Sequence, residues 1–210
     1  MAESCRKILL QNFIHASLDP TTATVSETMP KYGRPDYDAI RALLHIASIH
    51  FRLAFGLTAT RPKVHYLGQF SWGHRVAHSE ELALTREDEE RAFAALEDSA
   101  TYVSAVQVHT ALESVHDDPF HIREADVASA FQISRLIRNA FAHNPFNPVW
   151  DVRDPWKNRR FVVPDVITLD SAGLDGVPVR RQDYGGPIAI LRLIDYADKV
   201  VQARAEEGPA

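Results

Sequence analysis

Residues 131–144, with the sequence FQISRLIRNAFAHN, form the segment around which the rest of the chain is best interpreted. At about 100° per residue, the apolar side chains of this segment fall on one face of a helix. That face comprises Ile133, Leu136, Ile137 and Ala140, with Phe141 at its edge. The helix should end at Asn144-Pro145, because a residue before proline is pushed out of the α region. The segment therefore predicts an amphipathic helix with one buried face.

The opposite face of this predicted helix is polar. Arg135, Asn139 and His143 are spaced i, i+4, i+8 and form one row, with Arg138 beside it. Arginine offers a planar, permanently charged fork to a phosphate. Histidine can take and give protons near neutral pH. The combination is typical of phosphoryl-transfer sites, although a solvated helix face carries the same spacing by chance.

The motif Arg138-Asn139-Ala140-Phe141-Ala142-His143 resembles the R-x(4–6)-H signature of the HEPN superfamily, in which asparagine often follows the arginine. The resemblance rests on this one motif and on the helical character of its surroundings. It implies a helical bundle, usually dimeric, that is often a metal-independent endoribonuclease in toxin, phage-defence or RNA-processing systems. In a toxin, a neutralising protein partner would belong to the same expectation.

The composition of the whole chain is ordinary for a globular protein. At 210 residues it is long enough for one domain with a sizeable core. No apolar run approaches the ~20 residues of a membrane span, and the N-terminus lacks a signal pattern. The single Cys5 suits a reducing compartment, so we expect a cytoplasmic protein without a membrane segment.

The charge of the chain is unevenly distributed. A net charge of −5 argues against a protein that coats nucleic acid. Residues 131–160, however, hold six cations against two acids, so the motif lies in the basic part. This distribution permits a local contact with RNA without requiring one.

We expect a single, mainly α, HEPN-like domain over residues 1–210, built as a bundle of four to five helices. Residues 1–35 should form a short N-terminal helix, at 4–18, and a loop. Residues 36–148 should form the bundle core that holds the motif.

Within the bundle core, three long helices are predicted, at 37–55, 86–115 and 125–143. Asp36 and Thr85 supply the caps of the first two, and Gly56 should end the first. The predicted buried positions of the first two helices are Ile40, Leu43, Leu44, Ala47, Phe51, Phe55, Phe93, Leu96, Ala100, Val103, Val108, Ala111 and Leu112.

The pattern changes after the motif. Residues 149–186 contain three short β-like runs, at 161–163, 166–169 and 177–179, which predict a β-hairpin or a three-stranded flap. Gly185-Gly186-Pro187 should then open a C-terminal bundle helix over 187–205, since proline is favoured in a first helical turn.

Aromatic and basic side chains follow the motif closely. Such mixtures can stack on and neutralise single-stranded RNA, although a packed hairpin with a solvated rim has the same composition. The members of this group are Trp150, Trp156, Lys157, Arg159 and Arg160. We expect Arg135, Asn144, Trp150 and Lys157 to contact the substrate.

The expected function is cleavage of RNA by attack of a ribose 2′-hydroxyl on the adjacent phosphate, as the resemblance implies. His143 would act as general base or acid, Arg138 would stabilise the charge of the transition state, and Asn139 would orient the imidazole or bind phosphate. No metal or cofactor is required by this chemistry.

Two alternatives stay open. One is a catalytically silent dimerisation or ligand-binding bundle, in which Arg138 and His143 stabilise a subunit interface. The other is a metal-dependent hydrolase that uses His74 and His78, which share one face if their segment is helical.

The spacing of the motif also bears on assembly. Five residues of a straight helix subtend about 500°, so Arg138 and His143 point roughly 140° apart. Either the break at Asn144-Pro145 distorts the last turn, or two copies of the motif meet across a two-fold axis. We expect a homodimer in which the two 131–144 helices face each other.

Overall fold

The computed structural model describes residues 35–62, 69–78, 83–116, 118–119 and 121–207. The chain divides into two compact units, residues 1–33 and 34–210, and the described residues belong to the second. The helix predicted at 4–18 and most of the loop after it therefore lie outside the described residues.

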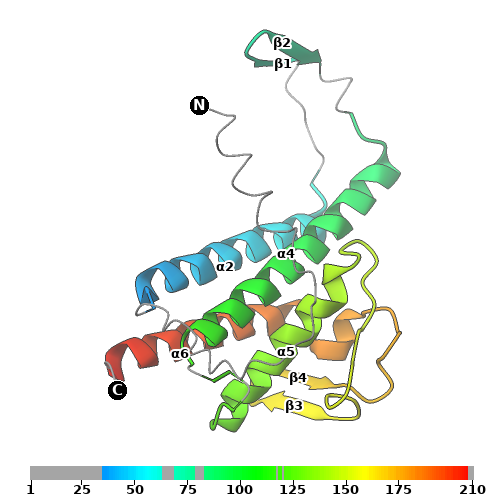
Figure 1. Ribbon diagram of the computed structural model, residues 1–210. Coiled ribbons are helices and arrows are strands. Elements are labelled where there is room, and N and C mark those ends of the chain that lie inside the picture. Colours follow the sequence, from blue (N-terminus) through cyan, green and yellow to red (C-terminus); the bar gives the residue numbers. More distant parts are fainter. Residues whose placement is uncertain (1–34, 63–68, 79–82, 117, 120, 208–210) are drawn as a thin grey trace, which may run out of the picture. The chain divides into compact units, whose positions relative to one another are not determined.

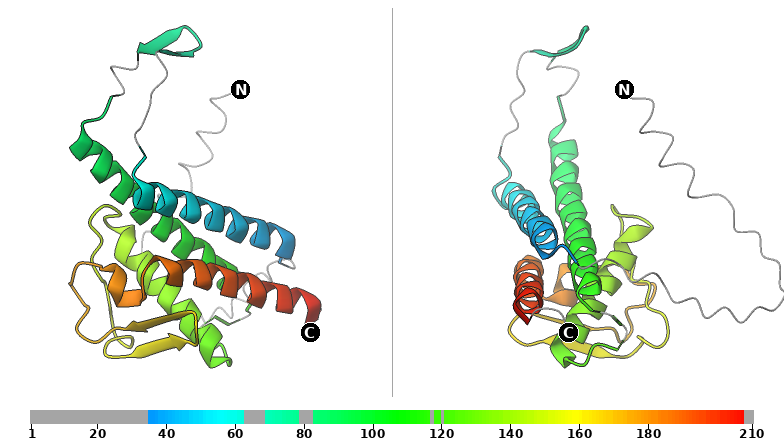
Figure 2. Two further views of the ribbon diagram at one scale, coloured as in Figure 1. Left: turned by 180° about the vertical axis from the view of Figure 1, so that it is seen from behind. Right: turned by 60° about the vertical axis from the view of Figure 1, so that its left-hand side comes forward.

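The described part is mainly helical, as predicted. Its helices are α2 (Tyr37–Thr60), α4 (Arg86–Ser114), α5 (Ala125–Ala142) and α6 (Pro187–Glu207). Helix α4 packs against each of the other three, and α2 also packs against α6 (Figures 1 and 2). The predicted helices at 37–55, 86–115, 125–143 and 187–205 are all present.

The predicted caps explain where two of these helices begin. The Asp36 side chain accepts a hydrogen bond from the backbone N–H of Ala39, at 3.0 Å. The Thr85 hydroxyl accepts one from the N–H of Asp88, at 3.2 Å, and donates to its carboxylate, at 2.7 Å. Each cap satisfies a donor that a helix N-terminus leaves without an intrahelical partner.

The prediction that Gly56 ends the first helix is wrong, because α2 continues to Thr60. A glycine inside a helix costs only about 1 kcal/mol relative to alanine, so neighbouring contacts can outweigh it. Here the Thr58 hydroxyl lies 3.0 Å from the carbonyl oxygen of Ala54 and 2.9 Å from that of Phe93, which ties the last turn to α4. The helix ends at Arg61, which adopts the left-handed conformation directly before Pro62.

The insert before α6 contains a two-stranded antiparallel sheet, formed by β3 (Arg160–Val163) and β4 (Ile167–Asp170). This sheet packs against α5 (Figure 1). The run at 177–179 does not extend it into a three-stranded flap. Instead, Trp150 N–H donates to the Val177 carbonyl at 2.9 Å, and Val179 N–H donates to the Pro148 carbonyl at 3.0 Å. The segment directly after α5 is thereby paired with the segment directly before the 3₁₀ helix η1 (Arg181–Tyr184).

A second hairpin, β1 (Gln69–Trp72) and β2 (Arg75–His78), follows α2 in the chain. Gly73 has a φ of 60° in its tight turn, which glycine adopts readily. His74 lies in the turn and His78 in the strand, so the helical segment on which a shared metal site depended is absent at these residues.

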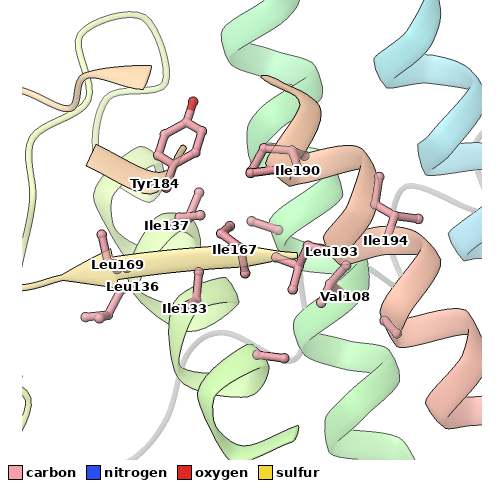
Figure 3. Packing of buried hydrophobic residues seen from close by; sticks show 14 of the residues in the cluster. Val108, Ile133, Leu136, Ile137, Ile167, Leu169, Tyr184, Ile190, Leu193 and Ile194 are labelled. Atoms are coloured by element: carbon pink, nitrogen blue, oxygen red, sulfur yellow. The ribbon is translucent and has the colours of Figure 1, made fainter. Parts of the chain in front are cut away.

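The core lies where α4, α5, α6 and the β3–β4 sheet meet (Figure 3). All five apolar residues predicted for the buried face of residues 131–144 are at most 2% exposed, as predicted. Leu43 and Leu96 were predicted to be buried but are 48% and 40% exposed. Leu43 belongs to a group of exposed large apolar side chains on α2, which also includes Ile46, Ile49 and Leu53.

Among the described residues, α2 is the one helix that is long and apolar enough to cross a membrane by length and composition alone. The core helix of a soluble protein passes the same test. Helix α2 buries Leu44, Phe51 and Ala54 in the bundle. Its Arg41 also makes a two-point ion pair with Asp198 of α6, at 2.8 and 3.1 Å.

Two leucines provide a matched test of this core. Leu112 is fully buried on α4, whereas Leu53 is 61% exposed on α2. We expect Leu112→Ala to lower the free energy of unfolding by about 2–5 kcal/mol, because it leaves a cavity. Leu53→Ala should change it by no more than about 0.5 kcal/mol. Urea denaturation of both variants measures the difference, and equal losses would contradict the packing described.

Candidate functional site

A cleft of about 340 Å³ lies beside the C-terminal half of α5. One wall comes from α5 and the residue after it, and the other comes from residues 151–156 of the insert. The lining side chains are Arg135, Leu136, Asn139, Ala142, His143, Asp151, Arg153, Asp154 and Trp156.

The polar row of the motif helix lines this cleft. Arg135, Asn139 and His143 are all present in its lining, because the opposite face of α5 is buried and turns the row outward. His143 is exposed and directly follows the last residue of α5, with helical φ and ψ of −85° and −36°. The chain then turns at Asn144, whose side-chain oxygen accepts from the Phe146 N–H at 3.3 Å. The imidazole is thus placed at the end of a rigid helix.

Arg138 reaches the cleft through its neighbour. It is not one of the lining residues, but its Nε and Nη2 lie 3.4 and 3.2 Å from the side-chain oxygen of Asn139. An amide that accepts through its oxygen keeps its NH₂ group for other partners. Asn139 therefore joins the guanidinium of Arg138 to the cleft that His143 lines.

The facing wall is built around Trp156. The guanidinium carbons of Arg135 and Arg159 lie 5.7 and 5.8 Å from the centroid of this indole, within the range of cation–π contacts. Arg153 beside it makes a two-point ion pair with Asp151, at 2.9 and 3.0 Å. The cleft thus combines an aromatic ring, two arginines, two carboxylates, an amide and an imidazole.

Three residues predicted to contact the substrate lie elsewhere. Trp150 is 1% exposed in the core and donates its indole N–H to Asp183 at 2.8 Å, so its ring offers no face for stacking. The Lys157 ammonium lies 2.8 Å from an Asp175 carboxylate oxygen. The amide of Asn144 makes the turn bond described above. The aromatic residue of the cleft is Trp156, which belongs to the same aromatic and basic group in the sequence.

One buried titratable residue behind the motif was not among the predicted site residues. His109 of α4 is 3% exposed, and its ring stacks on Phe131 with centroids 4.5 Å apart. Burial, followed by the charge of Arg138, lowers the pKa of His109 to about 4. The imidazole is therefore neutral at physiological pH. Its sequence signal was a histidine between Val108 and Ala111, within the apolar pattern of α4.

The depressed pKa of His109 predicts a loss of stability in acid. As pH falls, the unfolded chain protonates this imidazole near pH 6.5, whereas the folded chain resists until about pH 4. Stability that is intact above about pH 6.5 should decline toward pH 4 by up to about 3 kcal/mol from this residue. His109→Leu should remove that component, whereas His45→Leu, at an exposed position of α2, should keep it. Thermal melts across this range measure it, and parallel curves for wild type and His109→Leu would refute the assignment.

Comparison with known proteins gives no further guide to this cleft. No family model matches the chain, and neither a curated protein nor a solved structure matches it.

Proposed function

We propose that the chain is a metal-independent, HEPN-type endoribonuclease whose active site is the cleft beside α5. The observation that carries the proposal is that Arg135, Asn139 and His143 line one cleft opposite Trp156. The R-x4-H motif supplies the resemblance, and the cleft supplies a place where an RNA strand can meet it. A toxin or phage-defence effector with a neutralising partner is the biological role that the resemblance implies.

The proposed reaction needs only proton transfer and charge stabilisation. The ribose 2′-oxygen forms a bond to phosphorus as it loses its proton, the bond from phosphorus to O5′ breaks, and O5′ takes up a proton. The products are a 2′,3′-cyclic phosphate and a 5′-hydroxyl. His143 performs one of these proton transfers, a role typically worth about 10²–10⁴-fold in rate. Arg135 and the amide of Asn139 bind the phosphate, and Trp156 stacks a neighbouring base.

Single substitutions test the proposed active site. We expect His143→Ala to reduce cleavage by at least about 100-fold, since it removes the proton-transfer group. Arg138→Ala should also be inactive, and Asn139→Ala should be impaired. All three should melt within a few degrees of wild type, because these side chains lie outside the apolar core. Gel assays on a broad RNA panel, with EDTA present, measure the cleavage and the end groups.

The same assay includes a control variant and distinguishes the nuclease from the catalytically silent bundle. His45→Ala, an exposed histidine on α2, should cleave like wild type. A pure wild-type protein that cuts no RNA of the panel would favour the silent dimerisation or ligand-binding bundle. A His143→Ala variant that melts far below wild type, with no cleavage to lose, would make the motif structural.

The proposed assembly is a homodimer in which the two motif helices face each other. Arg138 does not line the cleft of its own chain, whereas the proposed chemistry uses this motif arginine to stabilise the transition state. A two-fold pairing of the C-terminal halves of α5 would bring Arg138 of one copy toward His143 of the other. An isologous dimer is the commonest assembly of soluble proteins.

Mixing inactive variants tests this composite site. In a 1:1 mixture of Arg138→Ala and His143→Ala, exchanged dimers contain one site with both native residues. Random exchange should therefore restore about a quarter of wild-type cleavage. Light scattering should report a dimer for each variant. Cleavage by a strict monomer, or a mixture that stays inactive although its subunits exchange, would rule the composite site out.

A further inference from the structure

A second cleft, of about 220 Å³, is lined in part by the end of α5 and the turn that follows it. Phe141 lines this cleft, whereas the next two residues, Ala142 and His143, line the first one. Phe146 and Asn147, from the turn itself, complete the near wall. Successive residues of the chain therefore contribute to the two clefts.

The far wall of the second cleft pairs a carboxylate with a guanidinium. Asp98 of α4 and Arg181 of η1 both line it, and they interact electrostatically. Arg181 is held in place by an ion pair, because its Nε lies 2.8 Å from an oxygen of Glu97, a side chain that is only 3% exposed. The anchoring contact is made by Nε, and a guanidinium carries four more N–H donors on its two Nη atoms.

Aromatic rings border the acid and the arginine. Tyr184 and Phe141 are buried beneath the cleft, whereas Phe146 is 67% exposed beside it. At about 220 Å³ the cleft is smaller than the ~300–1,000 Å³ typical of sites for drug-sized ligands. Its size and its rings suit one planar ring system. Its polar groups require that ring to present acceptors to an arginine and donors to a carboxylate.

We propose that this second cleft binds a guanine base of the RNA strand that is cut in the first cleft. Guanine presents two adjacent acceptors, O6 and N7, that match the fork of an arginine. Its N1–H and N2–H groups present two adjacent donors that match the carboxylate of Asp98. Single-stranded RNA is commonly read in this way, through bases that stack on aromatic side chains and bond by their edges. Adenine, cytosine and uracil lack this pair of edges. The inference rests on the proposed RNA cleavage and adds a base preference to it.

Nucleotide binding tests the base pocket without any need for cleavage. Calorimetric titration should show guanosine 5′-monophosphate binding at least about tenfold more tightly than the adenosine, cytidine and uridine monophosphates. Asp98→Ala and Arg181→Lys should each weaken guanosine monophosphate binding by about tenfold or more. The lysine keeps a positive charge beside Glu97 while it removes the fork. Asp195→Ala, which removes an exposed acid on α6, should leave binding unchanged.

Cleavage mapping then separates the two proposals. Wild type should cut RNAs beside unpaired guanosines, and Asp98→Ala should lose that preference while it still cuts. Guanosine monophosphate binding that depends on Asp98, in a protein that cuts no RNA, would keep the pocket and overturn the nuclease. Cleavage without base preference, together with equal or absent binding of the four nucleotides at millimolar concentration, would overturn the pocket and keep the nuclease. Thermal melts establish that each variant is folded.

Discussion

The packing of α5 between α4 and the β3–β4 sheet is the constraint on which the rest of the structure depends. Ten of its residues are buried, and they include Ile133, Leu136 and Ile137. Burial of one such side chain contributes roughly 1.5–3 kcal/mol, so a rotation of the helix by one residue would expose several of them at prohibitive cost. The solvent-facing side chains of the polar row contribute no stabilising free energy of comparable size. Burial of the apolar face fixes the rotation of α5 about its axis, and this rotation places the polar row in the cleft.

Two side chains buried on α4, Glu97 and His109, are polar and do not follow this apolar pattern. Burial raises the pKa of Glu97 and lowers that of His109, because it disfavours the charged form of each. The ion pair of Glu97 with Arg181 is a weak source of stability, because desolvation of the buried carboxylate and solvent screening of the half-exposed guanidinium both offset the attraction. An exposed pair such as Arg91–Glu87 contributes about 0–1 kcal/mol. The main effect of the ion pair between Glu97 and Arg181 is therefore to hold Arg181 beside the second cleft.

Structural features that depend on residues close in the sequence were predicted correctly, whereas features that depend on distant residues were not. The buried face of α5 and the caps at Asp36 and Thr85 depend on residues within one or two turns, and they were predicted from the sequence. Features that depend on distant partners were not. Helix α2 passes through Gly56 in part because Thr58 reaches α4, and the run at 177–179 pairs with residues that directly follow α5.

The tryptophans illustrate the same limit at the candidate site. Trp150 and Trp156 have similar surroundings in the sequence, so composition cannot say which one is buried. The difference arises because Asp183, 33 positions later, accepts the indole N–H of Trp150, whose ring is buried in the core. Trp156 instead lines the cleft, with two guanidinium groups within cation–π range of its ring. The sequence predicts aromatic residues near the motif, but only the tertiary structure shows that Trp156 is the one that lines the cleft.

Charge limits how the proposed nuclease can hold RNA. Nucleic-acid affinity that rests on the phosphate backbone requires many neutralised phosphates, and it is lost steeply with salt. The first cleft has two lining arginines, one of them already paired with Asp151, within a chain of net charge −5. So few cations cannot grip a long duplex. Selective binding must then come from stacking and from the edges of unpaired bases, which the ring of Trp156 and the acid–arginine wall of the second cleft are suited to provide. On this reasoning the proposed substrate is a single-stranded or looped RNA that is bound through a few unpaired bases.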